Sequence, residues 1–277
     1  MKLRDKFNES TRNFLTHALS IALIFLSSQF LASAPAQAQT VNEIVAKILQ
    51  ARGGLERAKS VRSVRITGKI YFNSEMYGPF LAEFKRPGMM HNEVTIRDQT
   101  VIRTFDGKNG GWIINPFNGQ NAAEPMSASE LKDAADEADF DGPLIDSEAK
   151  GNKIELAGKE QVEGRDAYLL KVTHKDGTVS NFSYDAKTYL LAKWSGMDMQ
   201  EGKAIERETY FQDYRDVAGL QFAFELVSKN PGGEYAQKIV VDKIEVDPAI
   251  DNSHFAKPAA PAASHEGTAA PAPKDNR

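Results

Sequence analysis

The sequence predicts a mainly β, α+β fold: an antiparallel sheet of about eleven strands that curls into a barrel-like shape, with an N-terminal helix and a helical lid. Three observations support this class. Apolar and polar residues alternate through most of the chain after residue 61, which is the period of half-buried strands. Turns rich in Gly, Asp, Asn and Pro separate these runs, as in hairpins. Two short segments instead show the period and the capping residues of helices.

The first 38 residues are typical of a cleavable export signal. A basic segment precedes an apolar run over residues 18–32, and Ala36-Gln37-Ala38 is a small-x-small cleavage site. An uncleaved membrane anchor is the alternative, although polar residues at 27–29 interrupt the run and spanning takes about 18 apolar residues. Cleavage after Ala38 would leave a mature chain outside the cytoplasm.

Composition excludes several classes of function. The chain has no cysteine, so it has no disulfide, no thiolate and no cysteine to lipidate. Loss of residues 1–38 removes four basic and two acidic side chains, and the formal charge changes from -4 to -6. Because nucleic acids and anionic membranes bind basic patches, this acidic surface argues against either as the main partner.

The mature chain is expected to begin with a helix and to continue in strands. Thr40 and Glu43 fit a capping box, an apolar stripe follows, and Gly53-Gly54 ends the helix. The first group of strands is predicted over residues 64–72, 80–85, 94–96, 101–105 and 112–114. Strands resume at residue 153, and the clearest cover residues 167–173, 179–184, 190–194, 205–211, 221–228 and 235–246.

The segment between the two groups of strands is predicted to be a lid. Ser127 and Glu130 fit a second capping box that opens an Ala-rich helix. Small residues bury little area, which suits an element that lifts. One side of this helix carries Leu131, Ala134, Ala135 and Ala138, and Phe140, Leu144 and Ile145 follow in a loop. The acidic residues Asp133, Asp136, Glu137, Asp139 and Asp141 are expected to form a solvated face.

No catalytic constellation is found, so the sequence predicts that the chain is not an enzyme and uses no cofactor or metal. It has no Gly-x-Ser-x-Gly, His-Glu-x-x-His, P-loop or dinucleotide motif. His91 and Glu93 lie two apart on a strand, where they are either ligands on one face or a half-exposed strand pair without a third ligand. His174 and His254 are expected at the surface.

An apolar interior remains to be explained. A curled sheet of this size either collapses onto its helices or encloses a hydrophobic guest. We expect Trp112 and Ile114 to face the guest space and Ile113 to pack behind the sheet. The methionines near the expected lid would either form an adaptable lining or fill gaps in a core; they are Met76, Met89, Met90 and Met126.

Two motifs resemble a known family. FKRPGMM, residues 84–90, and FDGKNGGWIINPFNG, residues 105–119, are similar to the signatures of the periplasmic outer-membrane lipoprotein carriers, the LolA/LolB-like superfamily. Residues 158–172 and 210–226 are similar to other segments of this superfamily, including relatives that regulate envelope stress. The resemblance covers roughly residues 41–258.

The resemblance implies an incomplete barrel around a hydrophobic cavity for acyl chains. Residues 39–257 would form this lipid-binding domain, with the lid at about residues 120–150 and a disordered Ala/Pro-rich tail over residues 258–277. Arg86 matches the family's lid latch, an arginine that bonds to lid backbone carbonyls; a rim arginine paired with a surface carboxylate is the alternative. Met90 matches a position near the cavity entrance that is aromatic in the family. The candidate lipid-binding residues are Phe72, Phe80, Phe84, Met90, Val94, Ile96, Phe105, Trp112, Ile114, Leu131 and Ala135.

The implied function is that of a periplasmic, monomeric carrier. It would bind acylated lipoprotein or lipid cargo, receive it from an inner-membrane lipoprotein-releasing transporter and pass it to an outer-membrane acceptor, with no nucleic-acid partner. The alternative on the same fold is an envelope-stress regulatory sensor that binds a lipid or a misfolded outer-membrane protein. A hydrolase with an unrecognised site is a third hypothesis.

Overall fold

The computed structural model describes residues 39–108, 110–200, 203–230 and 235–259. The expected signal peptide, residues 1–38, and nearly all of the expected tail, residues 258–277, lie outside the described residues. The helices and strands below all belong to the unit that begins at Thr40. Within the described ranges, no helix is both long and apolar enough to cross a membrane.

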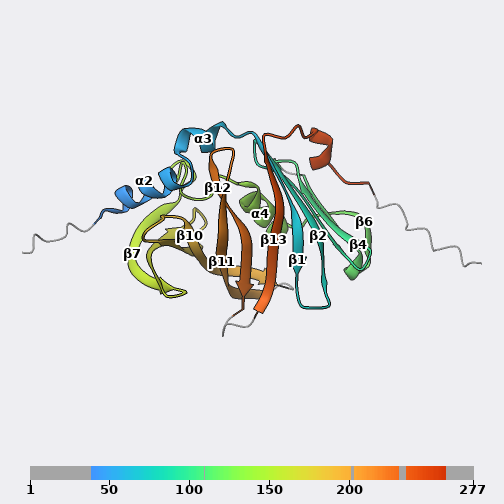
Figure 1. The fold of residues 1–277 in the computed structure, drawn as a ribbon. Helices are drawn as coiled ribbons and strands as arrows, with labels where there is room; N and C mark the ends of the chain where they lie inside the picture. The colour runs from blue at the N-terminus through green and yellow to red at the C-terminus, as the bar shows by residue number, and fades with distance from the viewer. Residues whose placement is uncertain (1–38, 109, 201–202, 231–234, 260–277) are drawn as a thin grey trace, which may run out of the picture. The chain divides into compact units, whose positions relative to one another are not determined.

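Thirteen strands in the described residues form one antiparallel sheet (Figure 1). Strands β1 to β6 pair in chain order, strands β7 to β13 do the same, and β1 pairs with β13 in the middle of the sheet. The strands are β1 (Ser63–Tyr71), β2 (Tyr77–Lys85), β3 (Met89–Ile96), β4 (Gln99–Phe105), β5 (Gly111–Asn115), β6 (Gln120–Pro125), β7 (Lys153–Val162), β8 (Arg165–Thr173), β9 (Val179–Asp185), β10 (Leu191–Gln200), β11 (Lys203–Val217), β12 (Leu220–Lys229) and β13 (Tyr235–Val246). Since β6 and β7 end the order without pairing, the sheet is an incomplete barrel, and the predicted fold class is confirmed.

The sequence underestimated the number of strands. Strand β6 lies in the segment assigned to the lid, where no large apolar residue alternates with polar ones. It is a mostly exposed edge strand, and such a strand carries little of the period-2 signal on which the prediction relied. The lid helix therefore begins after this strand, at Ala128.

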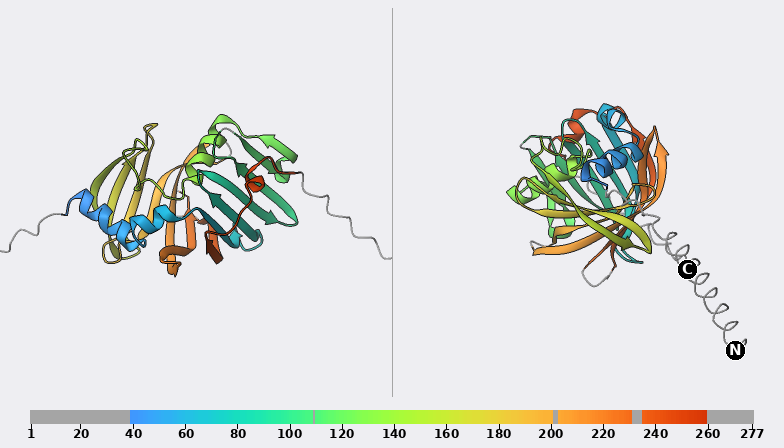
Figure 2. Two further views of the ribbon diagram at one scale, coloured as in Figure 1. Left: turned by 90° about the horizontal axis from the view of Figure 1, so that it is seen from above. Right: turned by 90° about the vertical axis from the view of Figure 1, so that its left-hand side faces the viewer.

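Three α-helices in the described part lie on one face of the sheet, which we call the inner face (Figure 2). They are α2 (Val41–Ala51), α3 (Leu55–Ser60) and α4 (Ala128–Ala138), and two 3-10 turns, η1 (Pro116–Asn118) and η2 (Asn252–Phe255), complete the elements. Both predicted capping boxes are present, at Thr40 with Glu43 and at Ser127 with Glu130. The short helix α3 was not predicted.

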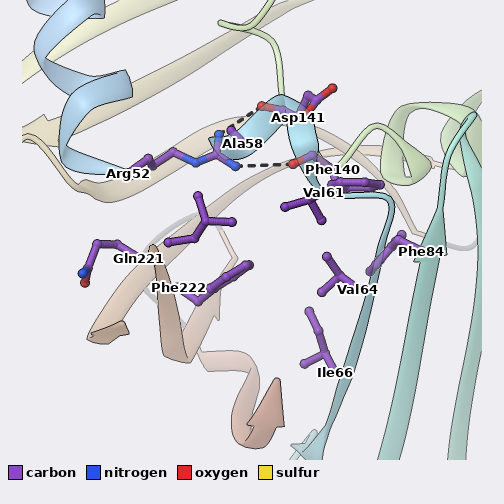
Figure 3. Close-up of a pocket in the computed structure, with 11 residues that line it drawn as sticks. Arg52, Ala58, Val61, Val64, Ile66, Phe84, Phe140, Asp141, Gln221 and Phe222 are labelled. Atoms are coloured by element: carbon purple, nitrogen blue, oxygen red, sulfur yellow. Dashed lines mark hydrogen bonds between the residues drawn. The ribbon is translucent and has the colours of Figure 1, made fainter. Parts of the chain in front are cut away.

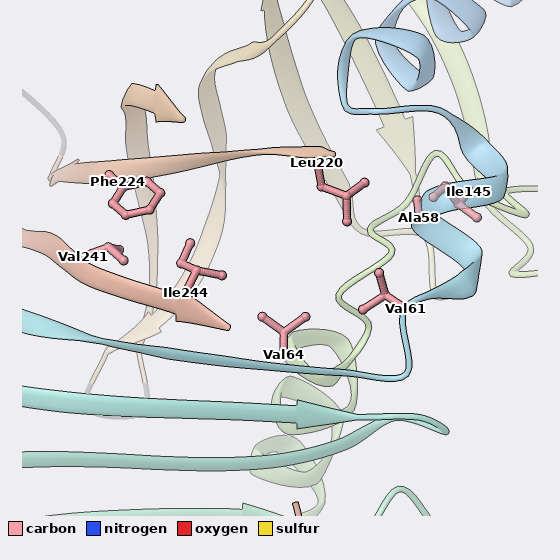
Figure 4. Close-up of a cluster of buried hydrophobic side chains, with 8 residues drawn as sticks. All are labelled: Ala58, Val61, Val64, Ile145, Leu220, Phe224, Val241 and Ile244. Carbon is pink, nitrogen blue, oxygen red and sulfur yellow. The ribbon is translucent and has the colours of Figure 1, made fainter. Parts of the chain in front are cut away.

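The inner face carries three apolar clusters. In the first, β1, β12 and β13 pack against α3 and the loop after α4, through residues such as Val64, Phe224 and Ile145 (Figure 4). In the second, Ile44 and Ile48 of α2 pack against β8 and β9. The third cluster lies under α4, where Ala134 and Ala138 are buried against side chains of β3 and β4.

The C-terminal segment covers the opposite, outer face of β2 to β4. Phe255 in η2 is only 1% exposed. The Lys85 Nζ donates to the carbonyl of Ile250 at 2.6 Å, and the Thr104 hydroxyl donates to the carbonyl of Ala256 at 3.2 Å. The residues of β2 to β4 that are buried on this outer face are polar: Glu83, His91 and Thr104.

Candidate functional site

Arg86 directly follows β2 and holds the loop after the lid helix. Its two terminal nitrogens donate to the two carboxylate oxygens of Asp141 at 2.6 Å each. Its remaining bonds go to main-chain carbonyls at the end of α3: Nε to Val61 at 2.7 Å and Nη2 to Ala58 at 3.3 Å. A bidentate arginine–carboxylate pair is among the stronger charge-assisted contacts in proteins. We call Arg86–Asp141 the central pair.

The central pair differs in detail from the predicted latch. The sequence resemblance implied that Arg86 would bond to lid carbonyls, but it binds the Asp141 carboxylate instead. The lid carbonyls are bound by Arg52, which donates to Asp141 O at 3.0 Å and to Phe140 O at 3.4 Å (Figure 3). Arg52 is the C-cap residue of α2, and its local sequence gave no signal of this role.

Electrostatics at the central pair favour both charged forms. Burial alone would raise the pKa of Asp141, but the hydrogen bonds and charge of Arg86, with smaller effects of Lys150 and Arg52, hold that pKa below its ordinary value. The Asp141 hydrogen bond in turn raises the pKa of Arg86. The guanidinium carbon of Arg86 also lies 4.7 Å from the centre of the Phe140 ring, at a distance typical of a cation–π contact.

The acidic run of the lid is not simply a solvated face: Asp141 is buried, and two partly exposed members are also bound to side chains of other segments. Asp141 is bound by Arg86, as described above. Glu137 accepts bonds from Arg103 at 2.9 Å and from Asn92 at 2.7 Å, both on inner-face positions of β3 and β4. Asp139 pairs with Lys150 at 2.5 Å. Asp133 and Asp136 are exposed, as expected.

A small apolar cavity lies beside the central pair. Its volume is about 80 Å³, and Val64, Ile66, Phe84 and Phe222 supply much of its lining (Figure 3). Sites for drug-sized ligands usually measure about 300 to 1,000 Å³. Beside the central pair, side chains therefore fill most of the space, and a long alkyl chain could occupy this cavity only if the lid moved.

Most of the candidate lipid-binding residues share the inner face. Phe80 packs against the first cluster and Phe84, Met90, Phe105 and Leu131 belong to or pack against the third. Val94 pairs with Phe80, and Ile96 is two residues further along β3 on the same face. Phe72 lies beyond the end of β1, in the hairpin to β2, and Ala135 is exposed on α4. Of the candidate lipid-binding residues, Phe84 is the one that lines the small cavity beside the central pair.

Trp112 and Ile114 lie on the outer face, and the predicted orientation of β5 was wrong. Trp112 pairs with Thr104, whose hydroxyl binds the C-terminal segment, whereas Ile113 packs under the lid with the third cluster. A Cβ added to Gly111 would meet Leu131 of the lid at 2.6 Å, which fixes the odd-numbered positions of β5 on the inner face. Because both faces are covered here, hydrophobicity could not assign the face.

His91 and Glu93 contact each other, and they lie on the outer face. The His91 Nε2 is 2.8 Å from Glu93, and its Nδ1 is 2.8 Å from the carbonyl of His254. Burial lowers the pKa of His91, but the bonds to Glu93 and to the His254 carbonyl outweigh this effect and raise it overall. These contacts attach the C-terminal segment to β3. In the described residues, no group of three or more His, Asp or Glu side chains could hold a metal ion.

The methionines near the lid are divided between core and surface. Met90 is fully buried and Met126 is 6% exposed, and both belong to the cluster under α4. Met76 is 36% exposed in the hairpin between β1 and β2. Two flexible thioethers thus lie where the lid meets the sheet, a position that tolerates repacking.

Comparison with known proteins shows the fold. No protein-family model matches the chain, and no curated protein matches its sequence. A DUF1329 family protein from Desulfovibrio piger has a similar structure, with a TM-score of 0.50 and 12% identity over 78% of this chain and 97% of that one. A LolA superfamily protein from Nitrosomonas europaea has a TM-score of 0.48 and 13% identity over 79% of this chain and 99% of that one. An outer membrane lipoprotein-sorting protein domain from Vibrio parahaemolyticus has a TM-score of 0.49 and 12% identity over 76% and 95% of the two chains.

The open antiparallel sheet with helices on its inner face is the fold that this chain shares with the DUF1329 family protein. At 12% identity, the likeness concerns the fold and not the ligand or the partners.

Proposed function

We propose that this protein is a periplasmic carrier that binds acyl chains of lipoproteins, or of a related lipid, and transfers them toward the outer membrane. The observation that carries the proposal is a lid attached by ion pairs over an apolar inner face. Helix α4 itself contributes only small buried side chains, Ala134 and Ala138, while Arg86, Arg103 and Lys150 bind the acidic residues of the lid. Ion pairs can break and form again in water without a large loss of apolar packing.

The energetics suit reversible binding. Burial of one methylene is worth about 0.8 kcal/mol, so a chain of about 14 methylenes gains on the order of 11 kcal/mol. A rigid cavity that fitted such a chain would release it very slowly. Since the cavity beside the central pair is only about 80 Å³, a chain that enters it must separate the lid from the sheet. Part of the gain offsets that separation, which weakens binding to a level that permits release.

The residues proposed to contact the alkyl chain are those on the inner face near the lid. Phe84, Met90 and Phe105 form the floor beneath α4, and Leu131 approaches from the lid. Phe80 packs against the neighbouring first cluster. Val94 and Ile96 extend this surface along β3. Because Trp112 and Ile114 lie on the outer face, they are not part of this proposed surface.

The proposal includes a place in the cell and a pair of partners. The export signal expected at residues 1–38 supports a periplasmic location, and a carrier needs a donor at the inner membrane and an acceptor at the outer membrane. Those partners would be a lipoprotein-releasing transporter and a lipoprotein acceptor. The motif at residues 84–90 supports this role, because it includes Arg86 of the central pair.

Lipid extraction tests the carrier function. The mature chain is purified from the periplasm without detergent, and its lipids are extracted. Mass spectrometry of the extract is expected to detect fatty acyl chains. When transfer of the cargo to the acceptor is blocked, the amount of lipid should approach that of the protein. A matched sample of a periplasmic protein without a cavity controls for adventitious lipid. If no acyl chain is recovered, and the chain instead co-purifies with a membrane-anchored signalling protein, the regulatory sensor is the better account.

A further inference from the structure

A second, larger hollow lies on the other side of the lid. It is a groove of about 880 Å³ between α4 and strands β9 and β10, within the usual range of ligand sites. Lys132, Ala135 and Asp136 line its α4 side, and Asp176, Phe182 and Trp194 line the opposite side. It shares no lining residue with the small cavity beside the central pair.

Helix α4 is attached differently on its two sides. Toward β3 and β4 it buries Ala134 and Ala138, and Glu137 is bound by Arg103 and Asn92. Across the groove, Lys132 reaches the turn between β8 and β9, where its Nζ lies 3.0 Å from Asp176. We call Lys132–Asp176 the groove pair.

The groove pair is prearranged on the sheet side. The Asp176 carboxylate accepts bonds from the Thr178 main-chain nitrogen at 2.9 Å and from the Thr178 hydroxyl at 2.7 Å, so its position does not depend on the lid. Both partners are well exposed, with 50% of the Lys132 side chain and 35% of the Asp176 side chain accessible. The central pair is more enclosed, since the Asp141 side chain is only 11% exposed.

We propose that the groove is the mouth through which a long alkyl chain passes, and that the groove pair closes it and breaks before the central pair does. The inference rests on the proposed carrier function. Exposed ion pairs contribute less than enclosed, bidentate ones, which sets the order of breaking. When Lys132 leaves Asp176, the edge of α4 can separate from β9 and β10 while Ala134 and Ala138 stay packed. Phe182 and Trp194 then offer an apolar path beneath the open edge.

The opening can be measured without a ligand, because the chain contains no cysteine. Spin labels are attached to Ala135→Cys and Lys175→Cys, two exposed positions on opposite sides of the groove. Pulsed electron paramagnetic resonance measures the distance between the two labels. In Lys132→Met, the population with the longer distance should be about two to five times that of the labelled protein that keeps Lys132, the range expected for loss of one exposed pair. Asp136→Asn is the matched control: it removes the negative charge that Lys132 contacts at 3.0 Å on its own helix and leaves the groove pair in place.

Equal label distances in Lys132→Met and Asp136→Asn would overturn the role of the groove pair.

Passage through the groove is tested separately by stopped-flow uptake of a fatty acid carrying a terminal pyrene. Lys132→Met should accelerate both association and dissociation by about two- to fivefold and leave Kd nearly unchanged, because the pair is present before and after the chain has passed. Unchanged rates despite a wider groove would show that the chain passes elsewhere. If the unlabelled parent protein binds no probe, the carrier function fails, whereas the label distances still decide whether the groove pair holds the lid.

Discussion

The Arg86 guanidinium and the Asp141 carboxylate form a bidentate ion pair, with both N–O distances at 2.6 Å, between the end of β2 and the loop that follows the lid helix. Fifty-five positions separate the two residues in the sequence. Arg86 also binds the carbonyl of Val61, while Arg52 binds that of Asp141, so this one contact connects the lid, α3 and the C-terminal end of α2.

The first prediction concerns the energy of this pair. Arg86→Leu leaves the Asp141 carboxylate enclosed and unpaired, so the free energy of unfolding should fall by about 2–3 kcal/mol, below the cost at a fully buried site because a third of Arg86 is exposed. The double variant Arg86→Leu with Asp141→Leu should recover about half of this loss, since no charge is left unpaired. Urea denaturation of the three variants measures the coupling. Additive effects of the two substitutions would show that the pair does not stabilise the closed lid.

The second prediction concerns pH. The folded-state pKa of Asp141 is depressed, so its contribution to stability is present above its ordinary pKa of 3.8 and is lost as the pH falls through the depressed value. Between about pH 4 and pH 2, the parent protein should lose more stability than Asp141→Asn does. The groups that face Asp141 are the basic side chains Arg86, Arg52 and Lys150, and Asp141→Asn leaves all three in place, so the difference between the two proteins reports on the carboxylate. Parallel stability curves for the two proteins would contradict the assignment.

The third prediction concerns the small cavity. Ile66→Phe adds volume to its lining and should weaken binding of a pyrene-labelled fatty acid by about tenfold, at a cost in stability of about 1–3 kcal/mol from overpacking. Thr67→Phe adds a similar bulk to the adjacent position of β1, whose side chain points to the other face of the sheet. This control should bind like the parent protein in a fluorescence titration. Equal binding by both variants would place the alkyl chain outside this cavity.

The fourth prediction uses the two tryptophans of the chain as reporters. Trp194 lines the groove, whereas Trp112 lies on the outer face. In Trp112→Phe, emission from the remaining Trp194 should shift to shorter wavelength when an unlabelled fatty acid binds, because the ring loses water. In Trp194→Phe, emission from Trp112 should stay constant. A change in the emission of Trp112, without a change in that of Trp194, would show that Trp112 faces the bound chain, as the sequence predicted.

Local signals in the sequence were sufficient for most of the fold. The capping boxes at Thr40 and Ser127 use residues three positions apart, and the strands with one buried and one solvated face show the period-2 pattern clearly. Strand β6 lacks that pattern because most of its residues are exposed. The short helix α3 has too few residues to show a helical period.

The site was predicted less completely, because its contacts join distant parts of the chain. Arg86 could be identified from the motif around it, but nothing local distinguishes Asp141 from the other acidic residues of the lid. Arg52 looks like an ordinary residue at a helix end until the lid loop is placed above it. The face of Trp112 depended on a C-terminal segment more than 130 positions later, whose docking no periodicity reports.

Native mass spectrometry of the mature chain with a triacylated lipoprotein peptide tests the central claim most directly. The account predicts a one-to-one complex that survives transfer from solution, is weakened in Ile66→Phe and is unaffected in Thr67→Phe. A spectrum that shows only the free chain at an excess of peptide, with the lid and sheet folded as judged by circular dichroism, would contradict acyl-chain binding.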